Sequence, residues 1–472
     1  MSLGYASIFF LVPLGLGIFW LCYYRPMIVF SAYAASTGLD YLLAVAGFST
    51  RGLFSVGQGA LVILFAAAVL RRLLRPTPIP RLHWRLYGCL AAFVASVWLS
   101  AVFALSPTTG FALAATVTAY ATLPFTIATL ITSVAALRQL LLVIGLGVTL
   151  SGAIGVSQYF EVLPVVTQAN LAANEDLRGK VMEYRGLDNL AEGRRFAGPC
   201  RNPNGFAIVL LGGIPILFYL LFTRRPQAVR VASACALVIC SFSMALTMSR
   251  TGFVGLMAFL CSYLGTMFRD RDGTRFKTLI LAGLAIGVLA IIVVSLPGVT
   301  ERLAAARPGA AESSTTARTA VLIGGVQALL HHPFLGVGPA NTSLANYNGY
   351  GLGAHDMITG VFGELGLLGG LFFIALFWQG FRLVAAAQRV NSNDLPGLPH
   401  ANYFLWAFLI TLLAQGAGNP VYTDRVIWVI LGLCAAFHQV RLAGLPRRYG
   451  RSITVRRVLP AATEVTPILT SR

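Results

Sequence analysis

Long apolar segments recur along the whole chain, and they decide which folds are open to it. Stretches such as "LVILFAAAVL", "LILAGLAIGVLAIIVVSL" and "LLGGLFFIALFWQGF" lie in segments near the roughly 20 residues that an α-helix needs to cross a bilayer. Only 11% of the 472 residues are charged, whereas soluble domains average about 25%. The sequence therefore predicts an all-α polytopic membrane protein.

Twelve or thirteen membrane-spanning helices are predicted. The first has no basic segment before it and many spans after it, so it reads as a retained helix and not as a signal peptide. The chain is expected to form a single transmembrane domain over residues 1–472, with long loops at 160–203 and 297–356. The predicted spans are 8–24, 27–47, 53–70, 87–105, 110–132, 138–159, 204–222, 230–248, 252–268, 278–296, 357–386, 400–418 and 425–441.

Basic residues set the expected orientation, because short cytoplasmic connections are enriched in Lys and Arg. Counting spans alternately puts four basic segments on one side, which is therefore assigned to the cytoplasm together with the tail 442–472. Both long loops then face the opposite side. The same bias accounts for most of the net charge of +19, which favours anchoring to anionic lipid over nucleic-acid binding. The four segments carry Arg71, Arg72, Arg75, Arg81 and Arg85; Arg224, Arg225 and Arg230; Arg269, Arg271, Arg275 and Lys277; and Arg447, Arg448, Arg451, Arg456 and Arg457.

Cysteine usage indicates neither a disulfide nor a metal site. Six of the seven cysteines lie in or beside apolar spans, where Cys behaves as a small hydrophobe. Cys200 alone falls in a long loop on the non-cytoplasmic side, and no Cys/His spacing is typical of metal ligands.

Arginine in the non-cytoplasmic loops is the first sign of a binding site. Arg194, Arg195 and Arg201 lead into "CRNPNGFAIVLL", where Asn202 can cap a helix and Pro203 can occupy its first turn. A helix N-terminus presents free N–H groups to phosphate, and guanidinium groups beside it would complete an anion site.

Two further arginines are placed similarly. Arg250, in "TMSRTGFVG", lies in a short turn between two spans, and Arg318 opens a helical pattern that ends at Pro333 and is too short to span. We expect that helix to lie in the membrane interface. Snorkelling to lipid phosphates would explain each arginine alone, but together with Arg194 and Arg195 they suggest a diphosphate site.

The histidines divide into two groups. His331 and His332 precede Pro333, where a helix C-terminus favours His. His355 has no such local role, and Asp356 can act as the N-cap of the helix that follows. Glu364, farther along that helix, would be costly in contact with lipid and is expected to face the protein interior.

The segment from His355 carries a longer pattern. One residue, nine more and then Gly-x-x-Gly-Gly bring the chain to Gly366, Gly369 and Gly370. This resembles the His-Asn/Ser/Gln-x9-Gly-x-x-Gly pattern of bacterial O-antigen ligases, whose superfamily includes O-antigen and exopolysaccharide polymerases. "GPCRNPNGFA", "LTMSRTGF" and "HHPFLGVG" are similar to other landmarks of that superfamily, in the same order. Asp356 stands where the ligase pattern has Asn, Ser or Gln, which leaves ligase and polymerase both open.

The resemblance implies a multi-pass glycosyltransferase of the bacterial inner membrane with its active site facing the periplasm. It would transfer a glycan from undecaprenyl diphosphate, with inversion, to a sugar hydroxyl: lipid A–core for a ligase in lipopolysaccharide assembly, another lipid-linked glycan for a polymerase. A transporter or flippase of lipid-linked sugar is the rival from another class. Such proteins bind near the bilayer midplane, whereas the polar groups here gather at one face.

Residue types indicate how the transfer would proceed. Arginines can stabilise the leaving diphosphate, and the sixteen carboxyl side chains are too scarce to suggest a metal site, so no metal or other cofactor is expected. His355 is the predicted general base, because an imidazole pKa near neutrality suits that role. Asp424, in "NPVYTDRV", is expected to orient an arginine or the acceptor.

Overall fold

A computed structural model describes residues 20, 23–45, 56–76, 78–163, 195–200, 202–222, 226–267, 310–347, 353–354, 356–390, 401–419 and 421–443. Within these ranges every regular element is helical, and eight helices are long and apolar enough to cross a membrane. The predicted all-α polytopic membrane fold is therefore confirmed. The predicted spans 8–24 and 278–296 lie almost wholly outside the described residues.

The helices follow the apolar segments closely. The predicted span 110–132 is divided at Thr122 into two helices, because Pro124 has no backbone N–H to continue the hydrogen-bond ladder. The elements are α2 Pro26–Val45, α3 Val56–Leu74, α4 Arg81–Val102, α5 Pro107–Ala121, α6 Leu123–Leu130, α7 Val134–Tyr159, α11 Pro203–Phe222, α12 Gln227–Thr247, α13 Arg250–Met267, α16 Ala310–His331, α17 Thr342–Ala345, α18 Met357–Val390, α19 Ala401–Gly416, the 3₁₀ turn η2 Val421–Thr423, and α20 Arg425–Ala443.

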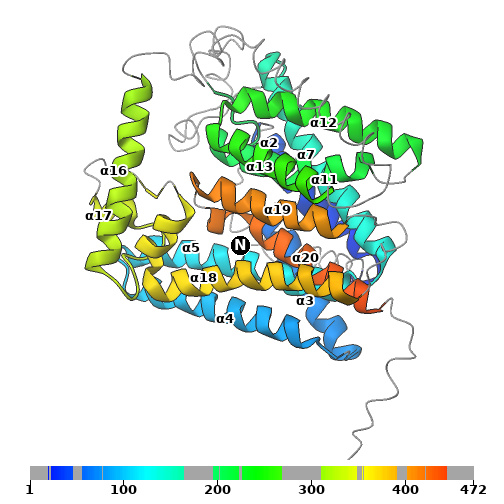
Figure 1. The fold of residues 1–472 in the computed structure, drawn as a ribbon, viewed down its shortest axis with the longest axis horizontal. Coiled ribbons are helices and arrows are strands. Elements are labelled where there is room, and N and C mark those ends of the chain that lie inside the picture. The colour runs from blue at the N-terminus through cyan, green and yellow to red at the C-terminus, as the bar shows by residue number, and fades with distance from the viewer. Residues whose placement is uncertain are drawn as a thin grey trace, which may run out of the picture.

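One long helix departs from the direction of the others. Figure 1 shows α4, α18, α19 and α20 running along one another, while α16 stands across one end of this bundle. The helix begins at Ala310, eight residues before the predicted start at Arg318, and reaches His331. An orientation across the bundle suits the predicted interfacial helix, since a spanning helix would run with the others.

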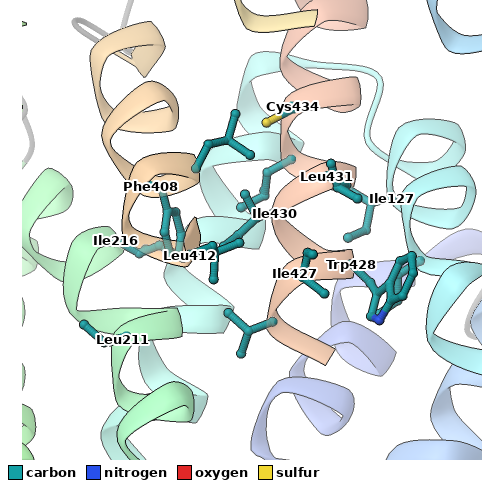
Figure 2. Close-up of a cluster of buried hydrophobic side chains, with 14 of the residues drawn as sticks. Ile127, Leu211, Ile216, Phe408, Leu412, Ile427, Trp428, Ile430, Leu431 and Cys434 are labelled. Atoms are coloured by element: carbon teal, nitrogen blue, oxygen red, sulfur yellow. The ribbon is translucent and has the colours of Figure 1, made fainter. Parts of the chain in front are cut away.

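Helix α20 forms the centre of the apolar core. Figure 2 shows side chains of α6, α11 and α19 turned toward it. Ile427, Trp428 and Leu431 are fully buried on different faces of this one helix. A helix that is apolar all round is buried all round, which places α20 inside the bundle. The side chains drawn with it include Ile127, Leu211, Ile216, Phe408 and Leu412.

Two histidines join α4 to α20 at the end of the bundle away from α16. His83 Nε2 lies 3.2 Å from His438 Nδ1, and both side chains are buried. No specific role was predicted for His83, His400 or His438. The structure gives the first and third a shared hydrogen bond, while His400 lies outside the described residues.

Candidate active site

Helix α18 covers the predicted span 357–386, and it is broken at Gly366, which the sequence did not predict. Gly366 has φ 67° and ψ −168°, a backbone conformation essentially reserved for glycine. A Cβ atom at this position would collide with the backbone of Phe334. The break exists because a neighbouring loop occupies the space that a continuous helix would need.

That loop is the "HHPFLGVG" segment, and its backbone takes over the hydrogen bonds that the break leaves open. Val337 N donates to the Gly363 carbonyl at 3.0 Å, and Gly338 N donates to the Glu364 carbonyl at 3.0 Å. On the far side of the break, Leu367 N donates to the Pro333 carbonyl at 2.8 Å. Two of the recognised motifs therefore form one backbone-bonded unit.

A buried carboxylate fastens this unit to the rest of the bundle. Glu364 is 5% exposed, which confirms that it faces the interior. The Tyr422 hydroxyl donates to its Oε2, and the Thr342 hydroxyl donates to Oε1 at 3.1 Å. Ser100 Oγ of α4 lies 2.6 Å from the Leu335 carbonyl and 2.9 Å from that of Glu364. We call Thr342, Glu364 and Tyr422 the carboxylate bracket.

The backbone on either side of position 355 is also fixed, on one side by the bracket and on the other by a helix cap. Ala354 N donates to Thr342 Oγ1 at 3.0 Å, so the hydroxyl that binds Glu364 also holds the residue before His355. On the other side, Asp356 Oδ1 accepts from Thr359 N at 2.6 Å, which confirms Asp356 as the N-cap of α18. His355 itself lies outside the described residues.

The arginine loop is held by a separate set of polar contacts. Arg195 Nε donates to the Thr247 carbonyl at 2.7 Å, and its Nη2 donates to Asn204 Oδ1 at 2.5 Å. Asn202 Oδ1 accepts from Gly205 N at 2.6 Å, so the predicted cap at the start of α11 is confirmed. Arg194 and Arg201 lie outside the described residues.

The turn that carries Arg250 joins the same network. Ser249 Oγ donates to Asn204 Oδ1 at 3.1 Å, and Asn419 Nδ2 donates to Thr251 Oγ1 at 2.8 Å. Arg250, half-buried, is the first residue of α13, two residues after Met248, which has the left-handed conformation. The Arg250 turn is therefore bound both to the start of α11 and to the segment between α19 and α20.

Two glycines bring the His355 segment and the Arg250 turn to one place. A Cβ on Gly416 would lie 2.9 Å from Met357 Sδ, so the start of α18 rests on the end of α19. A Cβ on Gly418 would collide with Thr251. Because Gly416 and Gly418 are two residues apart, Met357 and Thr251 sit over neighbouring points of one short segment.

Asp424 follows this segment, next to Tyr422 of the carboxylate bracket. Desolvation by burial raises the pKa of the Asp424 carboxyl to about 7, against the opposing effect of the Arg425 guanidinium. Burial likewise raises the pKa of the Cys200 thiol to about 12, with smaller effects of Arg425 and Asp424.

Some predicted residues are placed and others are not. Arg195, Arg250, Asp356 and Asp424 all lie on connected segments at one end of the bundle. Arg318 lies in α16, which packs on α18 through Gly325 and Thr359, and its side chain is outside the description. In the described part of the chain, no three His, Cys, Asp or Glu side chains form a metal-binding group.

Sequence reasoning missed three residues of this region. Thr342 and Tyr422 were not singled out, although a carboxylate inside an apolar helix requires hydrogen-bond donors nearby. Arg425 was passed over beside Asp424, because its contact with α2 joins segments far apart in the sequence. His331 lies in the last turn of α16, as predicted for a helix C-terminus. Both histidines also contact Tyr347: His331 stacks on its ring with the centroids 5.2 Å apart, and His332 Nε2 lies 3.3 Å from its hydroxyl.

Comparison with known families gives the architecture a context. Residues 235–374 match the family model described as O-antigen ligase, while no curated protein matches the chain. The matched segment runs from α12 to the middle of α18 and so contains Arg250, Arg318, position 355, the Gly366 break and the loop that fills it. Family members are membrane glycosyltransferase-like enzymes acting on lipid-linked glycans. The match over this segment supports membership of the O-antigen ligase family.

Proposed function

We propose that the protein is an O-antigen ligase that transfers a glycan from undecaprenyl diphosphate to a sugar hydroxyl of lipid A–core. The observation that carries the proposal is the meeting of the His355 segment with the Arg250 turn over Gly416 and Gly418. One segment would supply a base and the other a cation for the leaving group. Both are held by backbone and buried polar contacts, as positioned catalytic groups must be.

The transfer is a single displacement at the anomeric carbon. The acceptor oxygen forms a bond to that carbon from the face opposite the diphosphate, and the bond between carbon and diphosphate oxygen breaks. His355 receives the acceptor proton, and the electron pair leaves with the diphosphate. Attack from the opposite face inverts the configuration, and the step requires no metal or other cofactor when cations stabilise the departing charge.

The arginines share the diphosphate. Arg250 and Arg318 are the proposed direct ligands, with Arg194 and Arg201 beside the start of α11. Arg195 is proposed to complete the set from a fixed position, because two of its nitrogens already bind Thr247 and Asn204. Asp424 would orient an arginine or the acceptor.

A polymerase of the same superfamily is the second candidate. Asp356 stands where the ligase pattern has Asn, Ser or Gln, and it caps α18 through a carboxylate oxygen. Asparagine caps helices equally well, so Asp356→Asn should fold normally. A change of acceptor preference in that variant would connect the residue to the choice between lipid A–core and a second lipid-linked glycan.

Reconstituted transfer tests the proposal. The full chain in nanodiscs would receive an undecaprenyl-diphosphate-linked glycan with either lipid A–core or a second lipid-linked glycan as acceptor. We expect transfer to lipid A–core that persists in EDTA, and His355→Ala should reduce it about 10²–10⁴-fold. His331→Ala, which removes a ring that stacks on Tyr347, is the control and should remain active. Transfer that requires added magnesium, or that survives in His355→Ala, would refute the mechanism.

Orientation has its own test. The proposed location is the bacterial inner membrane, with the loops 160–203 and 297–356 facing the periplasm. A cysteine introduced at position 272 should resist membrane-impermeant labelling in intact cells, and one at position 186 should react. The reverse pattern would place the active site on the wrong side for this function.

A further inference from the structure

An apolar cavity lies between five helices, close to the start of α20. Its volume is about 60 Å³. The lining comes from α2, α6, α7, α11 and α20, with Ile127, Ile144, Val209 and Val429 among the residues on its walls. An apolar space of this kind does not hold ordered water, and at this volume it suits a short segment of a hydrocarbon chain.

Two polar groups border the otherwise apolar cavity. Tyr33 is 5% exposed, and its buried hydroxyl has no hydrogen-bond partner among the described residues. Arg425 also lines the cavity, and its guanidinium carbon lies 5.5 Å from the centre of the Tyr33 ring. Both groups can donate hydrogen bonds, and the buried Tyr33 hydroxyl is costly without an acceptor.

Arg425 is anchored but incompletely satisfied. Its Nη1 donates to Ser36 Oγ at 2.6 Å and approaches the Tyr33 carbonyl at 3.4 Å, both on α2. Among the described residues, Nε and Nη2 have no hydrogen-bond partner, and no carboxylate oxygen lies within ion-pair distance. A fixed guanidinium with a free edge fits phosphate, which accepts two hydrogen bonds from it.

The combination of a small apolar space with a phosphate-binding edge defines the ligand class. We propose that this cavity binds a resident membrane phospholipid with an anionic headgroup, its phosphate on Arg425 beside Tyr33 and a short segment of one acyl chain between α2, α7 and α20. The polar network around Arg195 and Arg250 shares no residue with this cavity. The proposal therefore stands independently of the glycosyltransferase function.

Binding of phosphatidylglycerol to the delipidated full chain, followed by native mass spectrometry, tests the site. Arg425→Gln should weaken binding about tenfold or more, because a charge-assisted hydrogen bond is lost. Tyr33→Phe should weaken it by a smaller factor. Diacylglycerol with the same chains, which lacks the phosphate, should bind weakly. Arg85→Gln, which removes an exposed arginine of α4, is the charge control and should bind like the wild type.

A second pair of variants tests the cavity without touching its polar groups. Ile144→Phe fills the space from α7 and should reduce phosphatidylglycerol binding, whereas Leu146→Phe adds the same ring at a 67% exposed position of that helix and should not. Equal binding by the wild type, Arg425→Gln and Ile144→Phe would overturn the proposal. Undecaprenyl phosphate binding tenfold tighter than phosphatidylglycerol would also overturn it, by assigning the cavity to the donor lipid.

Discussion

The core around α20 and the break in α18 hold neighbouring segments together in opposite ways. Around α20, the helices keep their hydrogen bonds to themselves and meet through side chains such as Ile427 and Leu431 (Figure 2). At Gly366, a loop and a helix exchange backbone hydrogen bonds and touch without side chains between them. The first arrangement tolerates changes of shape, because neighbouring side chains can repack. The second leaves no such room, and it occurs where the chain positions its candidate catalytic residues.

The largest expected effect is at the break itself. Gly366→Ala would force a Cβ into the Phe334 backbone at a φ of 67° that L-residues rarely adopt. We expect little folded protein, measured as monodisperse material by fluorescence-detected size exclusion. Gly88→Ala is the matched control, since Gly88 lies in regular helix α4 with open space around it. That variant should be as stable as the wild type or more so, by up to about 1 kcal/mol. A normal yield of folded Gly366→Ala would show that the loop backbone can move aside as readily as the side chains of the core repack.

A smaller effect is expected at the carboxylate bracket, where function should change more than folding. Glu364→Ala leaves the hydroxyls of Thr342 and Tyr422 without their acceptor and frees the backbone before position 355. We expect glycan transfer to fall about 10–100-fold per folded molecule, since a displaced catalytic group loses rate steeply.

Leu431→Ala provides the comparison from the core. Removing this buried side chain should cost about 2–5 kcal/mol of unfolding free energy. The molecules that remain folded should transfer at the wild-type rate. If transfer per folded molecule fell equally in both variants, the bracket would have no special role in positioning the site.

The smallest effect concerns pH. Asp424 has a folded-state pKa of about 7, above the value near 3.9 of an unfolded chain. The folded state then holds the proton more tightly, so the stability of the wild type should decline as pH rises from about 4 to 7. Asp424→Asn removes this decline. Melting temperatures should therefore favour the variant most at pH 8, less at pH 5, and not at all below pH 4. A constant difference across that range would mean that the Asp424 carboxyl titrates normally.

The sequence predicted the positions of the helices better than the break in α18 and the contacts between distant segments. Apolar runs identify α7, α11 and α20, because burying such segments in a membrane requires little beyond length and composition. The same run hid the break in α18, since Gly366 sits among Leu and Gly residues that suit a helix as well as a turn. Only the distant loop at 333–338 decides between them. The contact of Arg425 with Ser36 likewise joins residues nearly 400 positions apart, which no local pattern indicates.

The cap at Asp356 and the break at Gly366 are the two ends of a helical segment, so the spacing of the His355 motif fixes the distance and the rotation between them. Nine helical residues, 357–365, separate the two, a rigid rod about 14 Å long that holds two and a half turns. One inserted residue would rotate the capped end by about 100° relative to the loop at the break. The residue before the cap would then face away from the Arg250 turn. The length of this segment is therefore constrained as tightly as its residue identities, because the nine-residue interval sets the distance between the candidate catalytic position and the loop that supports it.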